Sequence, residues 1–404
     1  MVDDVVYMKR AIELAKLATG HTSPNPLVGA VVVKDNTIIG EGYHHKAGTA
    51  HAEVHALNQA GDNAKGATLY VTLEPCSHYG KTPPCALRII EAGIAKVIVG
   101  STDPNPLVSG KGMELLREAG IEVVCPVCSD ECAELNEHFF TYIQTGKPFV
   151  TLKSAMSLDG KIATSTGQSQ WITNESSRRD GHVLRATHDA MLVGIGTILA
   201  DNPQLNCRLN DTELCEAVLD TAVLKEPIPV HQPDVIILDS LGRTPTNSQV
   251  FDVENRKVHI FVSKGCPKDR IQALEQVGAQ VTVVESISTR KSKSTDIVID
   301  IKKLSIDDIL TKLGNLGYTS VLVEGGSAII SSFVETMNFD KVVTYIGNTI
   351  IGGNDATPAV GGRGFESLEV SPQLTFTKTK VLDNNIRIEA YRQGRRGAYV
   401  HGNR

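Results

Sequence analysis

The feature that most constrains this chain is an alternation of short apolar runs with segments of helical periodicity. The alternation occurs in two series. The first series contains apolar runs at residues 67–71, 97–99 and 121–124, and helical segments at 52–60, 86–92 and 112–119. Strands that alternate with helices form a largely parallel sheet with helices packed on it. This pattern predicts an α/β fold.

Further elements are predicted around the first series. Apolar positions at near-helical spacing predict a helix over residues 5–18. Two apolar runs, 29–33 and 37–40, are separated by a three-residue turn and predict a β-hairpin. A polar segment predicts one more helix over residues 129–142.

The second series follows a short breaker, TGKP at residues 145–148. Its strand-like runs are 149–153, 190–193, 235–238, 258–262, 281–284, 321–323 and 342–345, and helices are expected near 176–187, 267–277, 306–313 and 327–337. A length of 404 residues favours two domains, at roughly 100–200 residues each. We therefore place the boundary at the breaker and predict domains at 1–146 and 147–404.

Three segments interrupt the regular pattern. Residues 210–233 are irregular and predict a surface insertion, and the basic end of the chain, 392–404, predicts a frayed tail. The segment 286–295 alternates Lys and Ser. We interpret this segment as a solvated loop rather than a binding patch.

Charge and cysteine usage exclude several classes of protein. The net charge of -6 and pI of about 6.1 argue against a nucleic-acid partner, because nucleic-acid-binding domains usually have a pI above about 9. The eight cysteines are scattered, unlike those of a disulfide scaffold, and no apolar run approaches the roughly 18 residues of a membrane span. The N-terminus lacks the basic and apolar regions of a signal peptide. We therefore expect a cytoplasmic homo-oligomer with reduced thiols, a small-molecule substrate and no membrane partner.

The strongest chemical signal is the string His51-Ala-Glu53 followed by Pro-Cys76 and, nine positions later, Cys85. One imidazole and two thiolates supply three zinc ligands and leave a fourth tetrahedral position open for water, as in catalytic zinc sites. Glu53 suits the proton transfer that such a site requires. Residues at i and i+2 do not share a helix face, so both His51 and Glu53 can serve one site only if His51 lies at the first turn.

This His-x-Glu with Pro-Cys is the signature of zinc-dependent nucleobase deaminases, except that their Cys-x-x-Cys is stretched here. The string EPCSHYGKTPPC at 74–85 resembles the deaminase domain of the bifunctional riboflavin-biosynthesis deaminase/reductase family, as do SPNPLVGAV at 23–31 and GYHHKAGTAHAE at 42–53. The resemblance implies His51, Cys76 and Cys85 as zinc ligands and Glu53 as the catalytic residue. It also implies a pyrimidine and ribose-phosphate pocket lined by Asn25, His44, His78, Lys81 and Thr82.

The cysteines and histidines of this half of the chain also allow two other interpretations. A histidine and two cysteines in an α/β domain can be buried structural residues, but the coincidence of the spacing, the Pro-Cys turn and Glu53 argues against that reading. Cys125-Pro-Val-Cys128, with Cys132, is a rival metal site, but no second pair or histidine follows at ligand spacing. We interpret these three cysteines as structural or incidental.

The second half of the chain contains a Gly-Gly-Ser turn at residues 325–327, between an apolar strand and an apolar helix. Paired glycines at a helix N-terminus allow close approach of a phosphate, although the motif taken by itself is more typical of a plain strand-to-helix turn. No Gly-x-Gly-x-x-Gly follows a strand, so a Rossmann domain is disfavoured.

The strings SAMSLDGK at 154–161, SQWITN at 169–174 and GTILADNPQL at 196–205 resemble the reductase half of the same family. The resemblance implies a cytidine-deaminase-like three-layer α/β domain followed by a dihydrofolate-reductase-like α/β domain that uses NADPH. The implied NADPH-binding residues are Ala155, Trp171, Thr197, Asp201, Ser240, Gly326, Ser327, Ala328, Ile329, Ile330, Ser331 and Ser332. The implied substrate-binding residues are Ser169, Arg185, Leu205, Arg208 and Glu324.

Arg185 and Arg208 have support beyond the resemblance, because a guanidinium can form forked, charge-assisted bonds to a phosphate. The function predicted is zinc-dependent deamination of a diaminopyrimidinone ribosylamino phosphate, followed by NADPH-dependent reduction of its ribosyl group to ribityl. Two alternatives are a tRNA or nucleoside deaminase with an accessory domain, and a non-catalytic regulator built on a degraded enzyme. The acidic charge and the long 76–85 loop disfavour the first alternative, and the intact set of His51, Glu53 and two cysteines disfavours the second.

Overall fold

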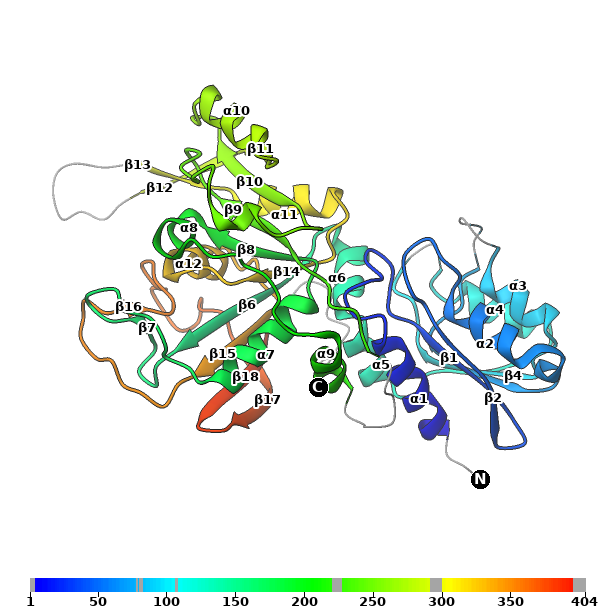
Figure 1. Ribbon diagram of the computed structural model, residues 1–404. Helices are drawn as coiled ribbons and strands as arrows, with labels where there is room; N and C mark the ends of the chain where they lie inside the picture. Colours follow the sequence, from blue (N-terminus) through cyan, green and yellow to red (C-terminus); the bar gives the residue numbers. More distant parts are fainter. Residues whose placement is uncertain are drawn as a thin grey trace. The chain divides into compact units, whose positions relative to one another are not determined.

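The computed structural model describes residues 4–77, 79, 83–105, 108–219, 227–290 and 300–394. The chain divides into two compact units (Figure 1). Of the described residues, unit 1 contains those up to Gly146 together with those from Asn210 to His231, and unit 2 contains Lys147–Leu209 together with those from Gln232 to Gly394. Among the described residues, no helix is both long enough and apolar enough to cross a bilayer.

Unit 1 is built on a five-stranded sheet of order β2-β1-β3-β4-β5. Its elements are α1 (Asp4–Lys16), β1 (Gly29–Lys34), β2 (Thr37–Tyr43), α2 (Ala52–Ala60), a 3₁₀ turn (Gly61–Ala64), β3 (Thr68–Leu73), α3 (Cys85–Glu91), β4 (Lys96–Ser101), α4 (Lys111–Glu118), β5 (Glu122–Val124), α5 (Ser129–Leu135), α6 (Glu137–Thr145) and α9 (Asp211–Val218). The predicted hairpin is confirmed, because β1 and β2 pair antiparallel. The strands β3, β4 and β5 are parallel, as expected of an alternating series.

Period-2 alternation sends side chains of these strands to two faces. Val32, Leu69 and Val97 join one core cluster with side chains of α2, α3 and α4. On the other face Tyr70 contacts Tyr7 of α1, with ring centroids 5.1 Å apart. Helices therefore cover both faces, which is the three-layer arrangement of a cytidine-deaminase-like domain.

The helix predicted over 129–142 is wrong in one respect, because two helices, α5 and α6, meet at Asn136. The Asn136 side chain bonds both main-chain groups of Leu27: it accepts from the N–H at 2.8 Å and donates to the carbonyl at 2.9 Å. An Asn amide that satisfies a distant backbone segment competes with helix continuity. This long-range bond could not be read from the local pattern.

Unit 2 is built on a nine-stranded sheet of order β11-β10-β9-β8-β14-β6-β15-β18-β17. Its strands are β6 (Phe149–Met156), β7 (Lys161–Ala163), β8 (Ala190–Gly194), β9 (Asp234–Leu238), β10 (Val258–Ser263), β11 (Gln280–Val284), β12 (Ser286–Arg290), β13 (Asp300–Leu304), β14 (Ser320–Val323), β15 (Lys341–Ile346), β16 (Thr357–Pro358), β17 (Leu374–Leu382) and β18 (Asn385–Arg392). Its helices are α7 (Glu175–Ala186), α8 (Ile195–Asp201), a 3₁₀ turn (Gln249–Phe251), α10 (Lys268–Gln276), α11 (Ile306–Asn315) and α12 (Ser327–Glu335). The strands from β11 to β15 are parallel, and β18 and β17 add an antiparallel edge.

Alternate residues of the central strands enter two core clusters. Val150, Leu192 and Ile236 pack with α11 and α12, whereas Met191 and Ile237 belong to a second cluster that includes residues of α8 and α10. Strands buried on both faces explain why these runs are almost continuously apolar. The carboxyl ends of the parallel strands meet at one edge of the sheet, where ligands of open α/β folds usually bind.

Two irregular segments differ from expectation. The loop predicted over 286–295 is wrong for 286–290, which form β12 and pair antiparallel with β13; residues 291–295 lie outside the described part of the chain. The expected insertion at 210–233 contains α9, which begins with a capping box between Asn210 and Glu213. Within unit 1, His21 Nε2 lies 2.7 Å from the carbonyl oxygen of Pro229, so this segment packs with the first 146 residues.

Candidate active sites

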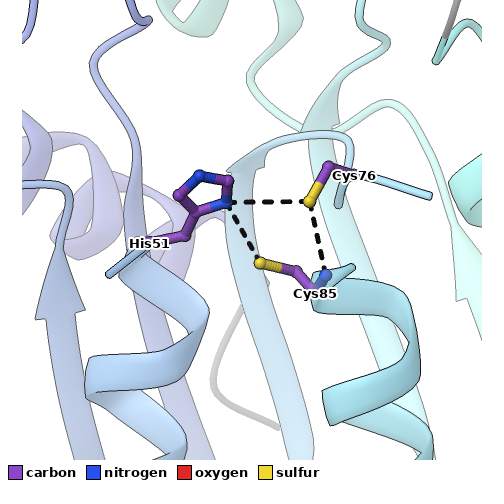
Figure 2. Close-up of side chains that lie close together, drawn as sticks. All are labelled: His51, Cys76 and Cys85. Atoms are coloured by element: carbon purple, nitrogen blue, oxygen red, sulfur yellow. Dashed lines mark hydrogen bonds between the residues drawn. The ribbon is translucent and has the colours of Figure 1, made fainter. Parts of the chain in front are cut away.

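In unit 1 the three predicted zinc ligands lie together at the ends of three elements. His51 is the N-cap residue of α2, Cys85 is the first residue of α3, and Cys76 follows β3 by three positions. His51 Nδ1 lies 3.2 Å from Cys85 Sγ and 3.7 Å from Cys76 Sγ, and the Cys85 N–H donates to Cys76 Sγ at 3.3 Å (Figure 2). The position of His51 just before the first helical turn is the one that its spacing from Glu53 requires.

The donor set fits a zinc ion. Its three ligand atoms lie within 4.8 Å of one another. Tetrahedral zinc with Zn–S of about 2.3 Å and Zn–N of about 2.0 Å separates its ligand atoms by roughly 3.5–3.8 Å, close to the distances found here. Hydrogen bonds from Cys85 and then His51 lower the pKa of Cys76 to about 4, whereas the bond to Cys76 and burial raise the pKa of Cys85. Zinc binds both cysteines as thiolates, so a metal ion at this site would displace the remaining thiol proton.

Glu53 lies in the first turn of α2 and is 3% exposed. Burial raises its pKa, although the neighbouring His51 acts in the opposite direction. A buried carboxyl group beside the ligands, but outside the ligand cluster, is placed to carry protons.

Two further predicted residues lie beside the ligands. His44 is 2% exposed, and its ring meets that of His51 edge-on with centroids 5.3 Å apart. His44 Nδ1 lies 3.1 Å from the Ala50 carbonyl, and Nε2 lies 3.1 Å from Asn25 Nδ2. Burial lowers the pKa of His44, so Nδ1–H donates to the carbonyl and Nε2 accepts from the amide. His78, Lys81 and Thr82 lie outside the described residues.

The rival cysteines form no comparable cluster. Among the residues that the structure describes, His51, Cys76 and Cys85 are the one group of three or more potential ligands close enough to hold a metal. Cys132 is fully buried, and its Sγ would lie 2.4 Å from a Cβ at Gly100. The close approach of sulfur and strand shows that Cys132 fills space in the core.

In unit 2 most of the residues expected to bind NADPH follow the carboxyl ends of the parallel strands. Thr197 and Asp201 lie on α8 directly after β8, and Ser240 follows β9. Gly326 is the N-cap of α12, which follows β14, and Ala155 lies near the end of β6. Because β9, β8, β14 and β6 are neighbours in the sheet, the fold brings these positions to one edge.

Not all of these side chains can face a ligand. Ile330 and Ser331 are 4% and 1% exposed, and Ile330 belongs to the core under α12. Leu205, expected to contact substrate, is 6% exposed and packs in the cluster that includes Ile195 and Ile198. Only their main-chain groups remain available to a ligand.

A cavity of about 280 Å³ lies beside this edge of the sheet. It is lined by several predicted residues, namely Ala155, Ser169, Trp171, Arg185 and Arg208. Trp171 is 67% exposed, and the guanidinium of Arg178 lies 4.4 Å from its ring centroid. The exposed indole therefore lines the cavity and is not part of the core.

A smaller cavity of about 140 Å³ shares Lys153 and Ala155 with the first and includes Glu324. Arg185 Nε and one terminal nitrogen donate to the two oxygens of Glu324 at 2.9 and 2.8 Å, and Lys153 Nζ lies 3.5 Å from the same carboxylate. Burial raises the pKa of Glu324, but Arg185 and Lys153 together hold it below its usual range. These two guanidinium nitrogens of Arg185 therefore bind Glu324 and are not available to bind a phosphate.

Three basic residues that line the larger cavity were not predicted from the sequence: Lys153, Arg178 and His182. Lys153 had a recognisable signal, because it is the one charged residue in the otherwise uncharged strand segment 149–156. His182 and Arg178 lie on α7, and their helical spacing alone does not distinguish a cavity from solvent. Only the packing of α7 beside β6 identifies them.

Comparisons with known proteins follow this two-unit division. Residues 1–101 match the cytidine and deoxycytidylate deaminase zinc-binding region, and residues 148–388 match the RibD C-terminal domain. The fold and the zinc-ligand geometry thus define a zinc-site deaminase domain joined to a reductase domain.

Relatives match along the whole chain. The riboflavin biosynthesis protein RibD of Bacillus amyloliquefaciens is 44% identical over 402 residues, 98% of this chain and 99% of the relative. The structure of RibD from Acinetobacter baumannii, form 1, has a TM-score of 0.80 and 36% identity over 96% of this chain and 99% of that chain. A Thermotoga maritima structure described as a diaminohydroxyphosphoribosylaminopyrimidine deaminase/5-amino-6-(5-phosphoribosylamino)uracil reductase has a TM-score of 0.77, at 38% identity over 96% and 98%. The chain belongs to the RibD family of bifunctional riboflavin-biosynthesis enzymes.

Proposed function

We propose that unit 1 deaminates 2,5-diamino-6-(5-phosphoribosylamino)pyrimidin-4(3H)-one to 5-amino-6-(5-phosphoribosylamino)uracil, and that unit 2 reduces the ribosyl group of this product to ribityl with NADPH. The observation that carries the proposal is the cluster of His51, Cys76 and Cys85 with the buried Glu53 beside it. The name of the Thermotoga relative, which joins the same deaminase and reductase activities, supports the pairing of the two reactions.

In unit 1 the chain holds the metal and moves the proton. A zinc ion at these ligands supplies Lewis acidity and lowers the pKa of water to about 7. We assign Glu53 to take the proton that the attacking water gives up and to pass it to the departing amino group, which leaves as ammonia. Asn25, oriented by its hydrogen bond with His44, is proposed to bind the pyrimidine. His78, Lys81 and Thr82 remain proposed substrate contacts.

In unit 2 the chain orients two ligands at the carboxyl edge of the sheet. NADPH, when bound, supplies the hydride, and the protein contributes position and electrostatics. We assign the cofactor to Ala155, Trp171, Thr197, Asp201, Ser240 and the main chain of 326–332. We assign the substrate to Ser169, Arg208 and the main chain at Leu205, with Arg185 and Glu324 as a fixed pair beside them. A phosphorylated pyrimidine as partner, a cytoplasmic location and a homo-oligomeric state also stay predictions.

The role assigned to Glu53 predicts that one substitution separates deamination from zinc binding and from reduction. In Glu53→Gln the zinc content should persist while ammonia release falls at least about 100-fold, because a positioned acid/base group contributes roughly 10²–10⁴-fold. Reduction of the deaminated intermediate by NADPH should continue. Ammonia release without NADPH, NADPH oxidation with the intermediate, and zinc by elemental analysis measure the three quantities.

Glu91→Gln is the matched control, because it makes the same charge change on α3 at an exposed position, where Glu91 forms an ion pair with Arg88. It should leave all three quantities unchanged. A collapse of zinc content in Glu53→Gln would identify Glu53 as a ligand and contradict its assigned role. Wild-type protein that releases no ammonia from the diaminopyrimidine would overturn the proposed deamination itself.

A further inference from the structure

Residues Gln204–Arg208, which we call the strap, join α8 to α9 without forming a helix or strand. The strap carries Arg208 to the larger cavity. Its main chain includes Leu205 with φ of 52°, a left-handed conformation that branched and bulky residues rarely adopt. Such a conformation persists only where surrounding groups hold it.

Two side chains outside both cavities hold the strap from one side. Arg256 donates to the carbonyl of Leu205 at 2.7 Å and also to the carbonyl of Gln204. The amide of Gln232 accepts from the N–H of Cys207 at 2.9 Å and donates to its carbonyl at 2.9 Å. Neither Arg256 nor Gln232 lines the cavities at the sheet edge.

Two cavity residues hold two more main-chain groups of the strap. A terminal nitrogen of Arg185 donates to the carbonyl of Asn206 at 2.9 Å, and His182 Nδ1 accepts from the N–H of Arg208 at 3.3 Å. Each of the five strap residues therefore has a main-chain group bonded to a side chain from elsewhere in unit 2. The buried Leu205 side chain adds an apolar anchor.

We infer that the strap is a preorganised support that presents Arg208 to the phosphate of the reductase substrate, and that Arg256 and Gln232 are positioning residues that act through it. The inference rests on the proposed reductase function. Arg208 is exposed, so without the strap its long side chain and its main chain would both have to be ordered on binding. Because bonds from Arg256 and Gln232 already order the strap main chain in the folded protein, this part of the entropy cost does not arise on binding.

The test uses the full chain and ribose 5-phosphate, the phosphosugar part of the proposed substrate, as a probe. Arg256→Met should raise the dissociation constant of ribose 5-phosphate about 10-fold by calorimetry, with the dissociation constant of NADPH within about 2-fold of wild type. Gln232→Met, which removes both bonds to Cys207 at similar volume, should act in the same direction. Amide hydrogen exchange should accelerate in the 204–208 peptide of both variants.

Arg392→Met is the matched control, because Arg392 also donates to main-chain carbonyls, including that of Phe339 at 2.8 Å. Phe339 precedes the amino end of β15, whereas the candidate ligand site is at the carboxyl ends of the strands. It should leave both dissociation constants and the exchange of 204–208 unchanged. Unchanged affinity for ribose 5-phosphate despite faster exchange would overturn the inference, as would equal weakening of NADPH, which indicates general damage. Wild-type protein that binds the probe but shows no reduction would overturn the proposed function alone.

Discussion

His182 illustrates, at the scale of one residue, how the cavity controls protonation. The side chain is 8% exposed and lies among the cationic groups of Arg185, Arg208 and Lys153, with Glu324 as the opposing charge. Burial, and then the two arginines, lower its pKa to about 4. The ring is therefore neutral at physiological pH, and only a neutral ring can accept the N–H of Arg208 through Nδ1.

This lowered pKa predicts a pH dependence of stability. At pH values above about 6.5 His182 is neutral in both the folded and unfolded states. As the pH falls towards 4, the unfolded state binds a proton that the folded state does not, so stability falls by an amount on the order of 3 kcal/mol. At still lower pH both states are protonated and the loss is complete.

The variant that tests this dependence is His182→Asn, whose Oδ1 can accept the same N–H but does not titrate. Urea unfolding followed by the fluorescence of Trp171, the only tryptophan, reports unit 2 between pH 7 and 4.5. Carboxylates titrate alike in both proteins, so a shallower slope in the variant isolates His182. Equal slopes would contradict the assignment of a lowered pKa.

The turn from β14 to α12 shows, at the scale of elements, that two adjacent glycines have different roles. A Cβ on Gly325 would lie 2.5 Å from Ile329 Cβ, whereas a Cβ on Gly326 would meet nothing within 4 Å. Gly194, at the end of β8, is also close to Ile329, with a Cβ distance of 2.7 Å to its side chain. The glycine at 325 therefore allows α12 to pack close to the sheet.

Substitution of each glycine separates these roles. Gly325→Ala should destabilise unit 2 by about 1–3 kcal/mol, because overpacking must displace α12 or Ile329. It should also weaken NADPH binding. Gly326→Ala is the matched neighbour and should cost less than about 1 kcal/mol, since only the N-cap preference changes. Unfolding midpoints compare the two variants, and equal losses of stability would rule out the steric explanation.

At the scale of the whole molecule, the two sets of candidate residues belong to different units. His51, Glu53, Cys76 and Cys85 all lie in unit 1, and all the residues assigned to NADPH lie in unit 2. The metal and cofactor requirements of the two reactions should therefore be separable in the intact chain.

Removal of zinc with a chelator should abolish ammonia release and leave NADPH-dependent reduction of the deaminated product intact. Added zinc should restore ammonia release, because the three ligand atoms lie within 4.8 Å of one another. The measurement is the rate of each reaction on the same sample before chelation, after it and after zinc addition. Reduction that falls in parallel with deamination would contradict the separation.

Much of this architecture follows from local pattern. Apolar runs predicted the strands of both sheets that alternate with helices, because a buried strand must be apolar regardless of its partners. The antiparallel hairpin of β17 and β18 was not predicted, because Lys378 and Lys380 interrupt the apolar alternation of β17. The division of α5 from α6 was also missed, since it depends on Leu27, 109 positions away from Asn136 in sequence.

The sequence alone determined the chemistry that unit 1 can hold: an imidazole, two thiols and a carboxyl group at a spacing that places His51 at a helix start. Only the tertiary structure decided which of the two predicted phosphate-binding arginines of unit 2 is bound to a carboxylate of the fold. Arg185 and Arg208 are the same residue type in the sequence. In the fold, two nitrogens of Arg185 bind Glu324, whereas the strap holds the Arg208 side chain exposed. The physical reason is that a charge buried beside another must be paired, and the partner is chosen by packing between β14 and α7.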